Sequence, residues 1–270
     1  MEYTIKKLGI GEILDQGIKL LKNHFGTLFS IMLVLFIPII LIQTLIVWAL
    51  FPDLHAIQGQ MVAENARVLT ENIQVLMIVN VIFALVFLIV IRPLTEASVI
   101  SAVSSEYLGR TAHVGESIKH AVRRFKALLG TNLLGGLLIM IGFILLIIPG
   151  IYLAFRYYFS SYIVLVEGKS GSAALKKSGF LMKKNMGKAF LIGILLGIIG
   201  WFLGLISGLI PNMYIQGIVS IGIQAFLFAF GTAVGVVFYF SSRCQHENFD
   251  LTILADAMSE GENTETSEKS

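Results

Sequence analysis

Long apolar stretches separated by short charged segments dominate the chain. Asp, Glu, Lys and Arg are absent from four of them: 23–52, 72–91, 127–155 and 189–242. A helix needs about 20 apolar residues to cross the hydrocarbon core of a bilayer, and each stretch reaches that length. The last is long enough for two crossings and is divided by Pro211-Asn212, a turn signal. The pattern therefore predicts an all-α membrane protein.

We expect six transmembrane helices arranged as three hairpins. The expected spans are 27–50, 73–91, 127–148, 151–166, 189–210 and 218–240. The fourth is short: its length is about 24 Å at 1.5 Å per residue, against a hydrocarbon core of about 30 Å. A full crossing and a re-entrant hairpin both fit this segment.

An amphipathic segment precedes each expected hairpin. In residues 9–25 apolar side chains recur with the period of a helix, which favours a helix lying in the membrane interface. Residues 11–29, 115–133 and 172–190 align without gaps. Corresponding positions are Leu14, Ile118 and Leu175, then Gly17, Ala121 and Ser178, then Gly26, Gly130 and Gly187. This weak repeat predicts three units, each an interfacial helix followed by a hairpin; chance similarity is the alternative.

Composition excludes an ordinary soluble protein. Of the 270 residues, 56% are apolar and only 14% are charged, whereas soluble domains carry roughly 25% charged residues. We expect a single membrane domain over 1–242 and an acidic cytoplasmic tail over 243–270. The last dozen residues are polar, which predicts disorder from about residue 257.

The placement of lysine and arginine predicts the orientation. Four lie before residue 23, five in 109–126 and six in 167–188, whereas 51–72 holds one. Basic residues favour the cytoplasmic side. We expect a multi-pass protein of the plasma membrane with both termini in the cytoplasm.

Arg156 is the one charge inside the fourth apolar run. Such a residue usually faces a cavity, a partner or the interface. One interpretation is contact with a lipid phosphate or a substrate anion. The favoured one is snorkelling toward the outer headgroups from just beyond the Pro149 turn.

A basic segment follows that run. Its lysines interleave with apolar residues, which suits contact with an anionic inner leaflet, although topology alone also places lysines here. The lysines predicted to contact lipid or another anion, together with Arg156, are Lys176, Lys177, Lys183 and Lys184.

Two further patterns have more than one interpretation. Arg92 and Glu96 lie four residues apart, on either side of Pro93. They are interpreted either as a buried ion pair or, by preference, as markers of the inner membrane boundary. Small residues at Gly193, Gly197, Gly200, Gly204 and Gly208 are typical of close helix packing. We expect packing within the protein, with a dimer contact as the alternative.

The run PGIYLAFR, followed by VEG and ALKKS, resembles a bacterial integral membrane family named for the membrane domain of glycerophosphoryl diester phosphodiesterases. The residues that carry the resemblance are Pro149, Gly150, Tyr152, Arg156, Glu167, Leu175 and Ser178. Of these, we expect Pro149, Gly150, Tyr152, Glu167 and Ser178 to form a structural motif. In the phosphodiesterases the chemistry belongs to a separate soluble domain, whose acidic and histidine residues have no counterpart here. The resemblance therefore does not imply an enzyme.

These observations favour a non-catalytic membrane protein with a scaffold, accessory or membrane-stress role. The alternatives are a small transporter or exporter component and, third, a lipid-modifying membrane enzyme. We expect no cofactor, no metal site and no nucleic-acid partner. The expected partners are membrane lipids, with a second copy of the chain or a membrane protein left open.

Overall fold

The computed structural model describes residues 3, 5–50 and 62–251, of which 87% are helical and none is in a strand. Within these residues, five helices are long and apolar enough to cross a membrane. They are Phe25–Leu50, Ile73–Tyr107, Val114–Leu145, Met186–Gly208 and Ile215–Glu247. The prediction of an all-α membrane protein is confirmed.

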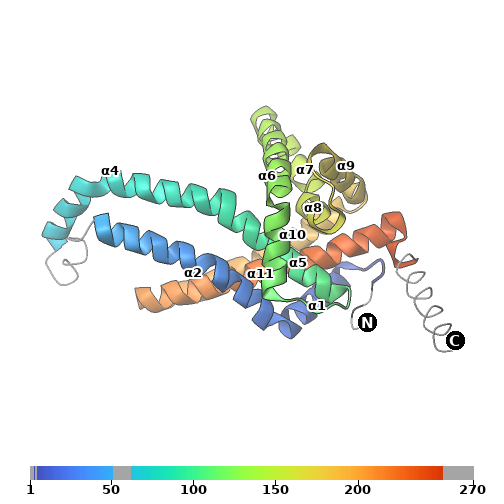
Figure 1. Ribbon diagram of the computed structural model, residues 1–270, viewed down its shortest axis with the longest axis horizontal. Helices are drawn as coiled ribbons and strands as arrows, with labels where there is room; N and C mark the ends of the chain where they lie inside the picture. Colours follow the sequence, from blue (N-terminus) through green and yellow to red (C-terminus); the bar gives the residue numbers. More distant parts are fainter. Residues whose placement is uncertain (1–2, 4, 51–61, 252–270) are drawn as a thin grey trace.

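Figure 1 shows the order of the elements. They are α1 (Ile10–Asn23), α2 (Phe25–Leu50), α4 (Val62–Val86), the π-helix η1 (Phe87–Ile91), α5 (Arg92–Tyr107), α6 (Val114–Leu145), α7 (Ile147–Arg156), α8 (Ser160–Glu167), α9 (Gly171–Met182), α10 (Met186–Gly208) and α11 (Met213–Glu247).

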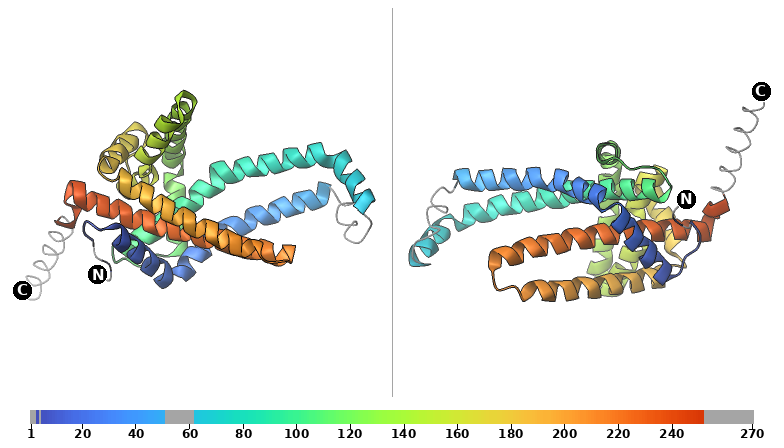
Figure 2. Two further views of the ribbon diagram at one scale, coloured as in Figure 1. Left: turned by 180° about the vertical axis from the view of Figure 1, so that it is seen from behind. Right: turned by 90° about the horizontal axis from the view of Figure 1, so that it is seen from below.

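Three helical hairpins project from a common centre. The α2/α4 and α10/α11 hairpins extend to the same side of the molecule, whereas α6 and α7 project at a steep angle to both (Figures 1 and 2). The α6/α7 tip is strongly apolar, and Ile144, Leu146 and Ile148 are 75%, 68% and 80% exposed. The hairpins therefore do not share one axis.

Residues 151–166, predicted as the fourth span, do not form one continuous helix. They are divided between α7 and α8, which have 10 and 8 residues and are separated at 157–159. In α8 the side chains of Tyr162, Ile163 and Val164 are buried. The run is apolar in this half because it packs inside the protein, and neither short helix reaches the length of a crossing.

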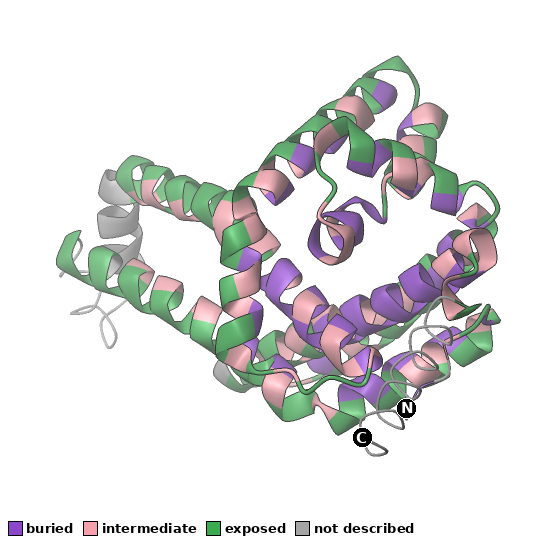
Figure 3. Ribbon diagram, turned by 45° about the vertical axis from the view of Figure 1, so that its right-hand side comes forward, coloured by how far each residue is buried: buried purple, intermediate pink, exposed green. Residues whose placement is uncertain are grey.

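The core lies around the C-terminal half of α11. Nearly every residue from Ala229 to Ser242 is buried, and the rings of Phe159, Tyr162 and Tyr239 pack together with centroids 5.6 to 5.9 Å apart. Buried residues gather where the helices meet, while the ends of the hairpins are exposed (Figure 3). This core holds α8 and α9 in position against α11.

Equivalent positions of the three repeat units are buried alike, but the helices of the units begin and end at different positions. The equivalent residues Gly17, Ala121 and Ser178 are all buried. The amphipathic helix α1 packs on α11, where a Cβ at Gly17 would lie 2.6 Å from Val234 Cγ2. The second amphipathic segment is continuous with its span in α6, and only α1 and α9 are separate helices.

Several predicted boundaries shift. Residues 62–72, expected as part of a loop, are the start of α4, and α11 continues to Glu247, beyond the expected end of the membrane domain. The rest of the loop, 51–61, and the tail from 252 lie outside the described residues. In the glycine-rich face of α10, a Cβ would meet another helix only at Gly200, 3.3 Å from Leu227, so internal packing explains only that position.

Candidate functional site

The lysines of the basic helix α9 and the lysine that caps its C-terminus, Lys183, lie in two different surroundings. Lys177 is largely buried and forms ion pairs with two carboxylates. Lys176 and Lys183 are exposed and lie on the side of Arg156. The lysines that the sequence grouped together therefore have separate roles.

Arg156 ends α7 and packs against α9. A Cβ added at Gly179 would lie 2.8 Å from Arg156 Nε, so the glycine makes room for the guanidinium. Arg156 Nη1 donates to the hydroxyl of Tyr152, one turn earlier, over 3.4 Å. These contacts place Arg156 beside the basic helix, ten residues along the chain from Leu146 at the hairpin tip. Arg156 therefore lies on the same side as Lys176 and Lys183, and snorkelling toward the outer headgroups stays a prediction.

A cavity of about 420 Å³ lies between α7, α9 and the start of α10. Its lining residues are Tyr152, Arg156, Lys176, Gly179, Phe180, Lys183 and Met186. In the described part of the chain, none of these three cations forms an ion pair with a carboxylate. Every ion pair found there involves other basic side chains. The cavity thus combines three positive charges with the apolar side chains of Phe180 and Met186. Lys184 is exposed and does not line it.

Ser178 holds the cationic end of α7 to α9. Its buried hydroxyl donates to the Arg156 carbonyl over 2.8 Å and accepts from the Phe159 N–H over 3.1 Å. Both backbone groups belong to the break between α7 and α8, where the regular helical partners are missing. A serine at this position of α9 therefore replaces two absent helical hydrogen bonds.

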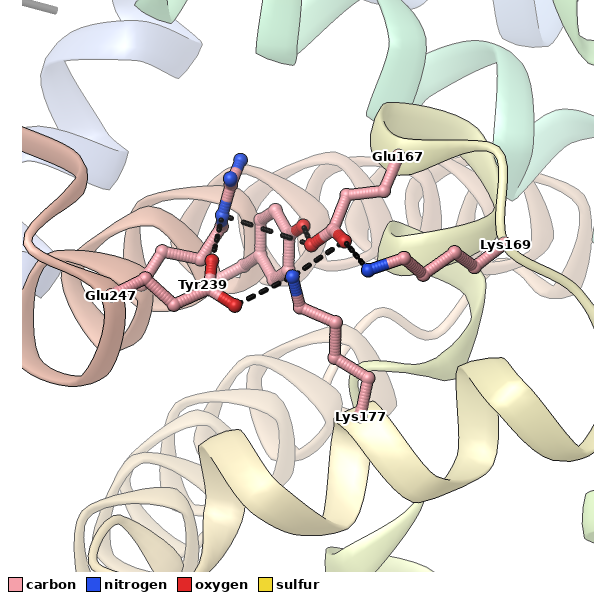
Figure 4. Close-up of polar contacts among 6 residues, drawn as sticks. Glu167, Lys169, Lys177, Tyr239 and Glu247 are labelled. Atoms are coloured by element: carbon pink, nitrogen blue, oxygen red, sulfur yellow. Dashed lines mark hydrogen bonds and ion pairs between the residues drawn. The ribbon is translucent and has the colours of Figure 1, made fainter. Parts of the chain in front are cut away.

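Glu167 is the centre of an ion-pair cluster (Figure 4). Its carboxylate lies 2.6 Å from Lys177 Nζ, 3.3 Å from Lys169 Nζ and 3.7 Å from Arg243 Nε. The Tyr239 hydroxyl donates to it over 2.7 Å. Burial alone would raise the pKa of Glu167, but hydrogen bonds from Lys177 and Tyr239 and the charges of Lys177 and Arg243 outweigh it, so the pKa is lowered.

Glu247 closes this cluster from the end of α11. It accepts from Arg243 Nε over 2.8 Å and lies 2.6 Å from Lys177 Nζ (Figure 4). The cluster joins α8, α9 and α11, so it sets the position of the basic helix relative to the core.

The turn of the α6/α7 hairpin is at Leu146, so Pro149 and Gly150 belong to helix α7 and not to the turn that the sequence predicted. A Cβ at Gly142 would lie 3.0 Å from Gly150 Cα and 2.9 Å from Leu153 Cδ1. The two helices therefore approach backbone to backbone. Pro149 lies in the first turn of α7, where its missing N–H costs no helical hydrogen bond.

The structure brings three of the five predicted contact residues together: Arg156, Lys176 and Lys183 share the cavity, whereas Lys177 is in the ion-pair cluster and Lys184 lies apart. Sequence reasoning missed Arg243, Tyr239 and Glu247. The four-residue spacing of Arg243 and Glu247 at the end of an apolar run was the available signal. His113 and His120 line a cavity with Glu116, but the described residues hold no group of three or more side chains suited to a metal ion.

The fold and this cavity define a helical membrane protein with a cationic pocket beside an apolar hairpin. No family model, curated protein or solved structure matches the chain. The resemblance to the phosphodiesterase membrane family therefore stays a prediction.

Proposed function

We propose that this is a non-catalytic multi-pass protein of the plasma membrane that binds the phosphate of an anionic phospholipid, in a scaffold or accessory role. The observation that carries the proposal is the cavity with three cations and no carboxylate partner among the described residues. Arginine binds phosphate through a planar pair of N–H groups, and Phe180 and Met186 lie where the lipid chains begin.

The orientation belongs to the same proposal. The basic segments lie on the cytoplasmic side with both termini, and the cavity faces the inner leaflet. Each basic residue near an anionic membrane surface contributes about 1 kcal/mol. Three such residues amount to about 3 kcal/mol, which is roughly a 100-fold preference for an anionic over a zwitterionic lipid.

Lipid binding to the purified full-length protein tests the proposal. Native mass spectrometry compares phosphatidylglycerol with phosphatidylcholine for the wild type, the triple variant Arg156→Ala/Lys176→Ala/Lys183→Ala, and the control Lys184→Ala. We expect phosphatidylglycerol to be retained preferentially by the wild type and the control, and the preference to be lost in the triple variant. Equal retention by all three proteins would show that the cavity is not a lipid site.

The single change Arg156→Lys refines this test. It keeps the charge but removes the planar pair of donors, so phosphate binding through the guanidinium predicts a loss of affinity. If Arg156 acts only as a positive charge at the interface, the lysine variant retains the wild-type affinity.

A role as a transporter or exporter component is the second candidate. One observation favours it: a cavity of about 410 Å³ lies between α2, η1 and α11, and Arg92 contributes to its lining. Substrate-dependent flux in liposomes that contain the purified protein distinguishes this candidate from a scaffold.

A further inference from the structure

The cavity at Arg92 is separate from the basic pocket and lies among candidate membrane spans. Its lining residues are Phe36, Phe87, Arg92, Ile221, Gln224, Ala225 and Phe228. Phe36 lies near the middle of α2, Gln224 lies within the apolar part of α11, and Arg92 lies within the Ile73–Tyr107 span. The cavity therefore combines mostly apolar walls with two polar side chains, all on helices that are candidate membrane spans.

The π-helix η1 shapes this site. Its wider turn ends with the Arg92 N–H donating to the Phe87 carbonyl, directly before Pro93. The Phe87 ring then packs on Phe36 of α2, with centroids 5.5 Å apart. Single π-helical turns occur frequently at functional sites. Here the turn places an arginine and an aromatic ring at the same cavity.

Arg92 is exposed at the cavity, and the described residues give its charge no direct partner. Within the described residues it forms neither an ion pair nor a side-chain hydrogen bond, and Glu96, one turn along α5, interacts with it only at longer range. The buried ion pair considered from the sequence is therefore absent from the described structure. A charged residue within a membrane span is costly and usually marks a ligand or ion site.

We propose that this cavity binds a single-chain amphiphile with an anionic headgroup, a carboxylate or a phosphate. Arg92 binds the headgroup with two N–H donors, and the Gln224 amide adds a further donor. The chain lies against Phe36, Phe87 and Phe228. This site goes beyond the proposed inner-leaflet lipid pocket and shares no residue with it.

Photo-crosslinking tests the proposal with the full-length protein in nanodiscs of zwitterionic lipid. The probes are three long-chain compounds that carry the same photoreactive group: a fatty acid, a lysophosphatidate and a fatty alcohol. We expect one or both anionic probes to crosslink to the lining residues and the neutral alcohol to do so at least about tenfold less, the factor expected for charge-assisted hydrogen bonds. Comparison of the two anionic probes assigns the headgroup.

Variants at the lining residues test whether this cavity holds the probes. Arg92→Gln is expected to reduce crosslinking of the anionic probes about tenfold or more, and Ala225→Leu, which fills the cavity and keeps the charge, is expected to reduce it as well. Lys184→Ala removes an exposed charge outside both cavities, so it is the control and is expected to leave crosslinking unchanged. If Arg92→Gln does not fold, Ala225→Leu alone decides. Equal crosslinking of the alcohol, or no effect of the variants that fold, would overturn the proposal.

Discussion

Ser178 illustrates how much one buried hydroxyl does in this protein. It accepts one backbone hydrogen bond and donates another across the break between α7 and α8. Ser178→Ala leaves both backbone groups without that partner, and an unsatisfied buried group costs about 1–3 kcal/mol. We expect a lower midpoint of thermal unfolding in detergent. Ser172→Ala, an exposed serine of the same helix, is the control, and a similar loss in both variants would contradict this role.

Glu167 predicts a pH dependence of stability. Its folded pKa lies below the ordinary value of 4.5, so its ionised form stabilises the fold. That contribution is fully present above pH 4.5 and is lost as the pH falls through the lowered pKa. We expect Glu167→Gln to cost on the order of 3 kcal/mol at pH 7, as for one partner of a buried ion pair.

Thermal unfolding of Glu167→Gln and wild type between pH 7 and pH 3 checks this. The difference between the two proteins is expected to shrink below pH 4.5. Asp15→Asn removes an exposed pair with Lys19 and is expected to change stability little at pH 7. A difference that stays constant with pH would show that the carboxylate charge is not what stabilises the cluster.

At the residue scale, the sequence showed which charged residues matter better than it showed which residues they contact. A lone arginine in an apolar run and a lysine-rich helix were visible, and both line the cavity. The sequence did not show that the lysines divide between the cavity and the ion-pair cluster. Lys176 and Lys177 are adjacent in sequence, and only the direction in which each side chain leaves the helix separates them. The partners of Lys177 include Glu247, far along the chain, and such long-range contacts leave no local pattern.

The α6/α7 hairpin gives a prediction for one structural element. A methyl group at Gly142 would meet Gly150 and Leu153 at 2.9 to 3.1 Å, and overpacking of this kind costs about 1–3 kcal/mol. Gly136 has nothing within 4 Å of its Cβ position, so alanine there is expected to be neutral or stabilising by up to about 1 kcal/mol. Thermal unfolding of Gly142→Ala and Gly136→Ala makes the comparison. Equal stability would show that the hairpin separates without cost.

At the element scale, the apolar runs were correctly predicted to be helices. Whether a run faces lipid or the protein interior was not always predicted correctly. The 151–166 run was interpreted as a span, although α8 is apolar because its side chains pack against the core. Hydrophobicity alone does not distinguish lipid from protein interior for a run this short. Its length and the internal Arg156 were the signs of a different role.

The directions of the hairpins lead to a prediction for the whole molecule. A bilayer crossed by α2/α4 and α10/α11 does not accommodate α6/α7 in the same orientation, because that hairpin is steeply inclined to them (Figure 2). We expect four crossings, with the apolar α6/α7 tip held at the cytoplasmic face. This arrangement also keeps all the lysine-rich segments on one side.

Cysteine labelling in intact cells tests this in a Cys244→Ser background. A cysteine at Asn212, in the turn between α10 and α11, is expected to react with an impermeant maleimide from outside. A cysteine at Ile148 is expected not to react from outside but to react after permeabilisation. External labelling at Ile148 would establish a full crossing by this hairpin and support the six-helix topology expected from the sequence.

The residues of the ion-pair cluster are translated at different times. Tyr239 follows Glu167 by 72 residues, which takes about 4 to 15 s of synthesis at roughly 5–20 residues per second. For most of that interval Glu167 and Lys177 have been translated but Tyr239, Arg243 and Glu247 have not. The basic helix therefore lacks its contacts with the end of α11 until the last hairpin has been translated, and until then Glu167 is the one carboxylate of the cluster that Lys177 can reach.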